Sequence, residues 1–324
     1  MQVPREPFLM SGETSRKSPP LSSISEQPSR ERIDMAEVLL RILIGFSPRS
    51  ASDDLLRLME PELVAAFARP VRLELMPGQQ GALAAREAIS SAPDGNTLLI
   101  ATFGTHAIIP TLKPDLGYDP IVDFTPVCLA TRAPLVLGVS TDLGVTCVED
   151  LVTLARRREL TQGSSGIGSA PYLAGLLFQR MTGVTLAHRA YTDTRDLYED
   201  FLGGRLDLSF NNAASMLPLV RGGRLSALAV TTSQRIAALP AIPTLEECGL
   251  SGYSLNNWLG FVAPPRTDPA IVAQQSRAIG MALRRPVIAD ALARDGIEIV
   301  GGTPGEFAAF IAAELERWSW LRSA

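Results

Sequence analysis

The chain has 324 residues, of which 46% are hydrophobic and 20% are charged, and its formal net charge is −4. This length suits two ordinary domains or one two-lobed domain with a large core, and the composition excludes a collagen-like or disordered protein. The longest basic run is Arg156–Arg158. Because nucleic-acid binding needs a concentrated basic surface, nucleic acid is not an expected partner.

The first 34 residues differ from the rest in being rich in proline, serine and scattered charge. A secretory signal needs about 7–15 consecutive apolar residues after a basic start, and the longest apolar run here is Phe8–Met10. We therefore expect residues 1–34 to be a disordered extension that ligand binding does not need, with Met35 as an alternative start. If the sequence is complete, this absence of a signal predicts a cytoplasmic protein. No run of 18 apolar residues occurs, so no membrane span is predicted.

Cysteine and histidine are scarce. Cys128, Cys147 and Cys248 lie far apart, and His106 and His188 are the two histidines. Their spacings do not match a zinc site, so no metal is predicted. The cysteines are either small buried apolar residues or include a Cys128–Cys147 disulfide, and the sequence leaves both open.

From Leu39 onward, short apolar runs alternate with amphipathic segments, which predicts an α/β fold with mostly parallel sheets. The predicted strands are Leu39–Phe46, Val71–Met76, Thr97–Thr102, Val127–Thr131, Leu135–Ser140, Leu206–Phe210 and Ala227–Thr231.

Three helix starts carry capping signals. Ser50 and Asp53 precede an apolar stripe, within which Pro61 predicts a kink or a split. Thr146 and Glu149 form a predicted capping box, and Thr303 begins the last helix with a proline and an acid in its first turn. The apolar stripe of that last helix is predicted to be core; its members are Phe307, Phe310, Ile311, Leu315 and Trp318.

The loop Gly163–Ser169 is the best candidate for a binding site. Its glycines let backbone N–H groups converge, its hydroxyls add neutral donors, and Ser169 stands just before a helical run with Pro171 in its first turn. This arrangement is typical of a carboxylate or phosphate site, although its composition also fits a flexible turn.

Catalytic motifs fail in this chain. Gly166–Gly168 lacks the third glycine of a dinucleotide fingerprint, the Walker lysine is absent, and Gly163–Ile167 is not a nucleophile elbow. His188 has no marked orienting partner, and His106 is expected to cap or line a pocket. Neutral donors without a nucleophile, base or metal indicate a binding protein, not an enzyme, and no cofactor is predicted.

Many short segments occur in one order that resembles a known family. They are Pro77–Gly81, Ala92–Leu99, Gly104–Ala107, Tyr118–Pro120, Asp123–Val127, Gly163–Gly166, Leu202–Gly204, Leu225–Thr232, Leu239–Thr244 and Trp258–Pro264. From about Leu40 to Leu321 the chain is similar to the Bug-type substrate-binding proteins of tripartite tricarboxylate transporters. The resemblance implies an α/β, two-lobed, periplasmic-binding-protein-like (type II) fold with two hinge crossovers. The first lobe would be residues 35–138 and 236–324, and the second residues 139–235.

The resemblance also implies where a ligand is held. In such proteins, three loops of the first lobe and a Ser/Gly loop of the second close on the ligand. Carried over to this sequence, the ligand-binding residues would be Ser47, Arg49, Ser50, Asp53, Gln79, Gln80, Thr102, Thr105, Ser164, Ser165, Ser169, Tyr191 and Asn211.

This chain departs from the family pattern at these loops. Arg49 and Ser50 stand where two glycines are usual, Gln79 and Gln80 replace Ala-Gly, and Asn211 replaces an acid. An inward Arg49 with Asp53 capping its helix predicts a carboxylate-bearing anion. An Arg49 paired with Asp53 predicts a neutral or zwitterionic solute, and an Arg49 that is solvated at the surface or paired with Asp54 contributes nothing to binding.

The resulting hypothesis is a solute-binding protein that captures a small carboxylate-bearing metabolite between its two lobes. Its ligand is expected to be a small organic acid or amino acid, and its protein partners the membrane components of a tripartite tricarboxylate-type transporter. It is expected to be monomeric and, by resemblance, periplasmic. The alternative is a cytoplasmic ligand sensor that kept the binding fold and signals to a protein partner.

Overall fold

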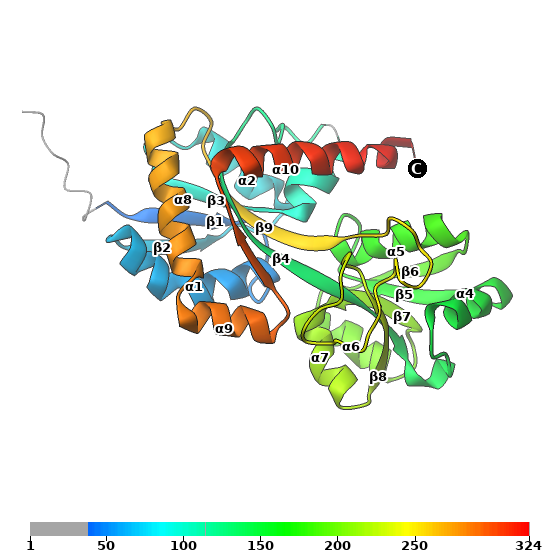
Figure 1. Cartoon of the computed structure of the whole chain (residues 1–324). Coiled ribbons are helices and arrows are strands. Elements are labelled where there is room, and N and C mark those ends of the chain that lie inside the picture. Colours follow the sequence, from blue (N-terminus) through cyan, green and yellow to red (C-terminus); the bar gives the residue numbers. More distant parts are fainter. Residues whose placement is uncertain (1–37, 114, 324) are drawn as a thin grey trace, which may run out of the picture. The chain divides into compact units, whose positions relative to one another are not determined.

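The computed structural model describes residues 38–113 and 115–323 (Figure 1). The predicted N-terminal extension, residues 1–34, lies outside this part. The described strands form two sheets that share the long strand β4 (Thr125–Ser140). The first sheet also contains β1 (Leu40–Ile44), β2 (Val71–Leu75), β3 (Thr97–Thr102), β9 (Asn256–Ala263) and β10 (Glu298–Gly301). The second contains β5 (Leu160–Ser164), β6 (Leu186–Ala190), β7 (Leu208–Asn212) and β8 (Leu225–Val230).

The helices divide between the sheets. With the first sheet lie α1 (Ala51–Phe67), α2 (Ala82–Ser90), α3 (Ile109–Leu112), α8 (Pro269–Leu283), α9 (Pro286–Arg294) and α10 (Pro304–Arg317). With the second lie α4 (Val148–Arg157), α5 (Ala170–Thr182), α6 (Thr194–Leu202) and α7 (Ala213–Arg221). Below, each sheet with its helices is called the first or the second lobe. No helix of the described chain is long and apolar enough to cross a membrane.

The strand β4 corrects the prediction of two strands separated by a break. Arg132 and Pro134 suggest an interruption, yet the strand continues through both and pairs with β9 from Thr125 to Pro134. Proline is tolerated where its nitrogen is not required by the ladder. Beyond Pro134, Leu135–Ser140 pairs with β7 and β8 of the second sheet.

Both sheets are mixed, so the prediction of mostly parallel sheets is wrong. The pairs β1–β2, β1–β3, β5–β6 and β5–β7 are parallel. The pairs made by β4 with β7, β8, β9 and β10, and by β9 with β3, are antiparallel. Every antiparallel pair of the described strands includes β4 or β9, the two strands at which the chain runs in the direction opposite to its neighbours.

Two apolar layers cover the first sheet. On one face, α1 and α8 lie side by side (Figure 1) and bury Leu56, Met59 and Ile279 against the strands. On the other face, α10 buries Phe307, Ile311 and Trp318, which confirms that its apolar stripe belongs to the core. The helix α1 runs through Pro61 as one element, so the predicted split does not occur. A proline removes a single N–H donor, and the apolar face of the helix compensates for that loss.

The capping predictions hold at two helices and fail at one. The Ser50 hydroxyl accepts the N–H of Asp53, and Thr303 and Glu306 form a reciprocal capping box. At α4 the cap is Cys147, whose Sγ accepts from the N–H of Asp150 at 3.4 Å, so the predicted Thr146 cap is displaced by one residue. Cysteine is a rare cap because its sulfur is a weak acceptor.

All three cysteines are free, which rules out the Cys128–Cys147 disulfide in this structure. Only Cys128 is buried, whereas Cys147 is exposed and Cys248 is half-buried. The interpretation as buried apolar residues therefore holds for Cys128 alone.

Close packing between β9 and α10 yields a stability prediction. A Cβ added at Gly260 would lie 2.3 Å from Cζ of Phe307 and 2.9 Å from the carbonyl oxygen of Cys128. We expect Gly260→Ala to lower the free energy of unfolding by about 1–3 kcal/mol, the usual cost of overpacking. Gly305→Ala is the matched control, because nothing lies within 4 Å of its added Cβ. Urea denaturation measures both, and equal stability of the two variants would contradict the packing.

Candidate functional site

The loops that follow β1, β2 and β3 meet at one edge of the first sheet. A Cβ at Gly45 would lie 2.8 Å from Cα of Gly81, and one at Gly81 would lie 2.5 Å from the methyl carbon of Thr105. Gly81 also has a φ of 92°, a backbone conformation that favours glycine. The three loops predicted to hold ligand are therefore in direct contact, at the edge where open α/β sheets bind ligands.

The first loop is organised by a carboxylate. Asp53 is buried, and its Oδ2 accepts the backbone N–H of Arg49 at 2.8 Å. Its Oδ1 lies 2.8 Å from Nε of Arg57, one helical turn further on. Ser50 caps the same helix, and Ser47 is exposed. The cap of α1 is thus Ser50 and not Asp53, whose carboxylate binds the loop backbone and has Arg57, not the Arg49 guanidinium, as its ion-pair partner.

Left-handed backbone occurs at three non-glycine residues of these loops. The φ angles of Arg49, Gln79 and Gln80 are 65°, 48° and 59°. Side chains rarely adopt this conformation, which costs of order 1–3 kcal/mol per residue and clusters at functional sites. These are also the positions at which the sequence departs from the glycine-rich pattern of the family it resembles.

The two glutamines of the second loop have different contacts. Oε1 of Gln79 accepts from the guanidinium of Arg86 within the first lobe. Nε2 of Gln80 donates to the carbonyl oxygen of Ile167 at 3.4 Å, which lies in the Gly163–Ser169 loop of the second lobe. Gln80 therefore lies between the lobes, whereas Gln79 does not reach across.

The third loop contains a compact set of hydroxyl contacts. Thr102 ends β3, and a single π-helical turn, Gly104–Ile108, follows it. The N–H of Thr102 donates to Oγ1 of Thr105 at 3.0 Å, and the N–H of Thr105 donates to Oγ1 of Thr102 at 3.1 Å. Isolated π-helical turns are rare and occur frequently at functional sites.

In the Gly163–Ser169 loop, two of the three predicted serines have intramolecular partners. Oγ of Ser164 lies 2.7 Å from Nε2 of His188 and accepts the N–H of Gly166 at 3.0 Å. Ser169, which was predicted to stand just before a helix, is the cap of α5, and its hydroxyl donates to the carbonyl of Gly166 at 2.7 Å. Ser165 is exposed and has no partner among the described residues. The sequence indicates a structural rather than a catalytic role for His188, and it does not reveal the pairing with Ser164, because β5 and β6, which bring the two together, were not predicted.

The two remaining predicted residues also have defined partners. The hydroxyl of Tyr191 donates to Oδ2 of Asp200 on α6 at 2.8 Å, and the bonds from Tyr191 and Arg205 lower the pKa of Asp200. Asn211, on β7, is buried, and its Nδ2 donates to Oγ of Ser209 at 3.0 Å. Because the Tyr191 hydroxyl already donates to Asp200, only the ring of Tyr191 is available to contact a ligand.

The loops of the two lobes approach each other at glycines. A Cβ at Gly104 would lie 3.4 Å from the carbonyl oxygen of Gly168 and 3.6 Å from Oγ1 of Thr102. A Cβ at Gly168 would lie 2.2 Å from Cδ1 of Ile109. These contacts place the third loop directly opposite the Gly163–Ser169 loop. A further contact joins the lobes: Nδ2 of Asn257 on β9 donates to Oδ1 of Asn212, the last residue of β7, at 3.3 Å. Asn257 is not among the predicted residues, because β9 was not predicted.

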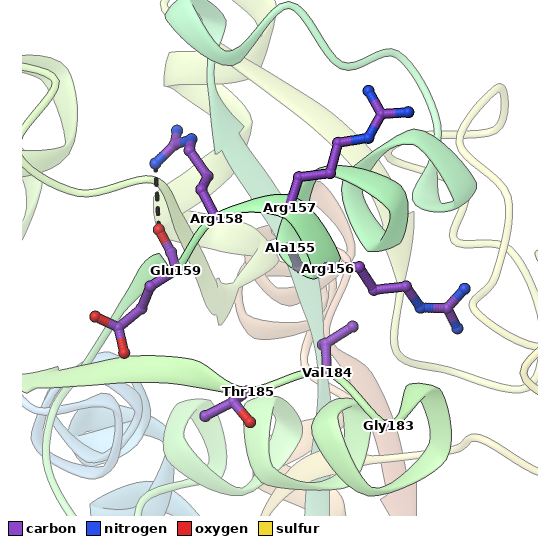
Figure 2. A pocket seen from close by; sticks show the side chains of 8 residues that line it. All are labelled: Ala155, Arg156, Arg157, Arg158, Glu159, Gly183, Val184 and Thr185. Carbon is purple, nitrogen blue, oxygen red and sulfur yellow. Dashed lines mark hydrogen bonds between the residues drawn. The ribbon is translucent and has the colours of Figure 1, made fainter.

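A surface depression elsewhere in the second lobe is not a comparable site. It lies where α4 ends and β6 begins, and Arg156, Arg157 and Arg158 are on its rim. Figure 2 shows these three side chains pointing in different directions, so their guanidinium groups do not converge on one anion. Arg158 instead donates to Asp207 at 2.9 Å. The described residues also contain no group of three or more potential metal ligands.

Chemically, the facing loops offer hydroxyl, amide and backbone donors in a setting of low charge. The acidic residue among the predicted ligand-binding residues, Asp53, is neutralised by Arg57 and turned toward its own loop. Such an arrangement can hold an anion without competition from a free carboxylate.

Comparison with known sequences identifies relatives along nearly the whole chain. Residues 55–323 match the family model described as the tripartite tricarboxylate transporter family receptor. The chain is 29% identical over 283 residues to Protein BugT of Bordetella pertussis, covering 86% of this chain and 87% of that protein. It is 31% identical over 281 residues to an Agrobacterium vitis protein from the TAR-I ttuE-ttuC' intergenic region, covering 85% and 81% of the two chains.

Solved structures agree. The Rhodopseudomonas palustris protein Rpa4515 with adipate is 32% identical, with a TM-score of 0.80, and the match covers 88% of this chain and 96% of that one. MatC from the same organism, with bound malate, is 27% identical, with a TM-score of 0.79 and coverage of 88% and 98%. These matches confirm the predicted periplasmic-binding-protein fold and a function in binding rather than catalysis. The chain belongs to the tripartite tricarboxylate transporter receptor family of solute-binding proteins.

Proposed function

We propose that this protein captures a small carboxylate-bearing metabolite between its two lobes. The observation that carries the proposal is the approach of Gly104 to the carbonyl of Gly168, which brings the third loop against the Gly163–Ser169 loop. The hydroxyl of Thr102 and the amide of Gln80 lie where these two loops meet, and the acid of the first loop, Asp53, is paired with Arg57. Carboxylates are bound well by several donors that converge without a competing negative charge.

A positive charge on the first loop supports an anionic ligand. Arg49 is exposed and Asp53 holds its backbone N–H, while the Arg49 charge opposes the rise in the pKa of Asp54 that burial causes. Arginine suits planar, bidentate recognition of carboxylates. Two relatives were solved with malate and with adipate, both dicarboxylates. A dicarboxylate would place one carboxylate among the neutral donors and the other within reach of Arg49.

Capture requires the lobes to move, and the chain connections suit such a motion. We assign residues 35–138 and 236–324 to one moving lobe and residues 139–235 to the other. The passages through β4 and toward β9 act as the hinges. The monomeric protein would deliver its solute to the membrane components of a tripartite tricarboxylate-type transporter, with the periplasm as the site of action. Cell fractionation tests that location, and a chain found in the cytoplasm would support a ligand sensor instead.

A ligand screen tests the proposed function. Thermal denaturation with mono-, di- and tricarboxylates and amino acids should show stabilisation that rises with concentration for dicarboxylates such as malate or adipate. Ligand binding to the native state adds about 2.7 kcal/mol of stability at 100 times Kd. The diamides of the same acids are the matched control and should not stabilise. Stabilisation by uncharged solutes alone would overturn the proposal.

The role of Arg49 is tested by Arg49→Ala, which keeps the Cβ and so leaves the left-handed backbone equally strained. We expect a loss of about 1.5–3 kcal/mol of binding free energy for the best dicarboxylate, or about 10- to 150-fold in Kd, as for other charged hydrogen bonds. Calorimetry measures this loss, and Arg277→Ala, an exposed arginine on α8, is the control. Equal affinities of the two variants would make Arg49 a surface residue without a role in binding.

A further inference from the structure

A chain of short contacts leads from a buried histidine, His106, to Thr102 at the end of β3. Nδ1 of His106 lies 2.9 Å from Oγ1 of Thr105, and that oxygen lies 3.1 Å from Oγ1 of Thr102. Oγ1 of Thr105 also accepts the backbone N–H of Thr102 at 3.0 Å. The side chains of all three residues are buried. The direction of each hydroxyl hydrogen is therefore set by its neighbours and not by water.

The hydrogen-bond capacity of Thr105 decides where the hydroxyl of Thr102 can point. A hydroxyl oxygen accepts two hydrogen bonds and donates one. If Nδ1 of His106 carries the proton, Oγ1 of Thr105 accepts from that N–H and from the N–H of Thr102, and both lone pairs are used. The hydroxyl of Thr102 then cannot donate to Thr105. If Nδ1 is bare, Thr105 donates to it, and one lone pair remains to accept the hydroxyl of Thr102.

The surroundings of the other ring nitrogen favour the proton on Nδ1. Nε2 of His106 is buried and has no hydrogen-bond partner within the described chain. The nearby rings are those of Phe124, at 4.8 Å between centroids, and Tyr118, at 6.4 Å. The hydroxyl of Tyr118 donates to the backbone oxygen of Thr105 and is not available to His106. Buried N–H groups without an acceptor are rarer than buried acceptors without a donor. The unpartnered Nε2 is therefore the nitrogen without the proton.

We propose that His106 is a positioning residue that turns the hydroxyl of Thr102 toward the space between the lobes, as a donor for the ligand's carboxylate. The proposal rests on the proposed function for its ligand. The donor would face the right place, because Oγ1 of Thr102 and the carbonyl of Gly168 flank the same side of Gly104. Contacts from Thr105, which His106 in turn holds, keep the donor in place before ligand arrives, which reduces the ordering cost of binding.

The arrangement does not depend on pH near neutrality. Burial lowers the pKa of His106 to about 3, so the ring stays neutral and keeps one bare nitrogen from mildly acidic to basic pH. The titratable side chain recorded next to the ring, Tyr118, has its pKa raised by burial and also stays neutral.

A double-mutant cycle tests the positioning role, with malate and adipate as probes in calorimetry. His106→Leu should weaken binding about 5- to 30-fold, and Thr102→Val should do the same. In the Thr102→Val background, His106→Leu should cost less than twofold, because the donor it orients is already gone. His106→Asn, whose side-chain amide can donate from near the Nδ1 position, should restore most of the affinity. His106→Gln, whose amide lies nearer the Nε2 position, should not.

The outcomes separate this role from a structural one. If His106→Leu costs the same factor with and without the Thr102 hydroxyl, His106 acts on the fold and the proposal is wrong. Thermal unfolding of each variant without ligand identifies losses that come from instability alone.

Nitrogen-15 NMR of the imidazoles tests the orientation without any ligand. The chain has two histidines, and a His188→Gln variant assigns their signals. We expect neutral His106 with the proton on Nδ1, and a proton on Nε2 would overturn the proposal. If neither probe binds but the proton is on Nδ1, the proposed ligand class fails and the orientation of Thr102 stands.

Discussion

Backbone hydrogen bonds along β4 join the two sheets and determine how the rest of the structure is arranged. The first part of this strand pairs with β9 and β10, and its last residues pair with β7 and β8. Because this one strand pairs with both sheets, it fixes which edges of the two sheets lie next to each other, and in the proposed function it is also one of the two hinges. As a result, the loop after β3 lies against the loop after β5, where Gly104 approaches the carbonyl of Gly168. The site exists because these loops meet, and no single loop contains it.

The loops of the site combine strained backbone with side chains whose polar atoms already have hydrogen-bond partners. Arg49, Gln79 and Gln80 occupy left-handed backbone, and Asp53, Ser164 and Ser169 use their polar atoms to hold their own loops. Such intramolecular bonds keep the loops in one conformation, and few groups are left to bind ligand. The remaining donors, among them Ser165 and the hydroxyl of Thr102, stand on loops that are already fixed. This arrangement suits a protein that must bind and release an intact solute and has no bond to make or break.

Much of the fold could be predicted from sequence, because strong local signals agree with the tertiary structure. An apolar run predicts the strand Thr97–Thr102, which is buried along its whole length. Polar cap residues predict the helix starts at Ser50 and Thr303, where their side chains do accept backbone N–H groups. The failures occur where local and long-range interactions disagree. Pro134 breaks the local pattern of β4, although β9 and the second sheet keep the strand extended through it. The strand β6 carries His188 and Arg189, whose polarity hides a strand that pairs with β5.

The candidate site was predictable as a set of loops but not as a set of contacts. The positions of Thr102, Thr105 and Ser169 follow from where strands end and helices begin. Which hydroxyl is committed to a neighbour depends on residues distant in sequence, such as His188 for Ser164 and Asp200 for Tyr191. No pattern along the chain contains that information, since these partners meet only through the pairing of β5 with β6 and the packing of α6. Whether the predicted residues touch ligand stays a prediction.

A crystal structure of the protein with malate or adipate tests the central claim most directly. The account predicts density for a carboxylate between the Thr102 hydroxyl and the Gly163–Ser169 loop, enclosed by residues of both lobes. Density for the ligand confined to one lobe, or in the depression beside Arg156–Arg158, would contradict it.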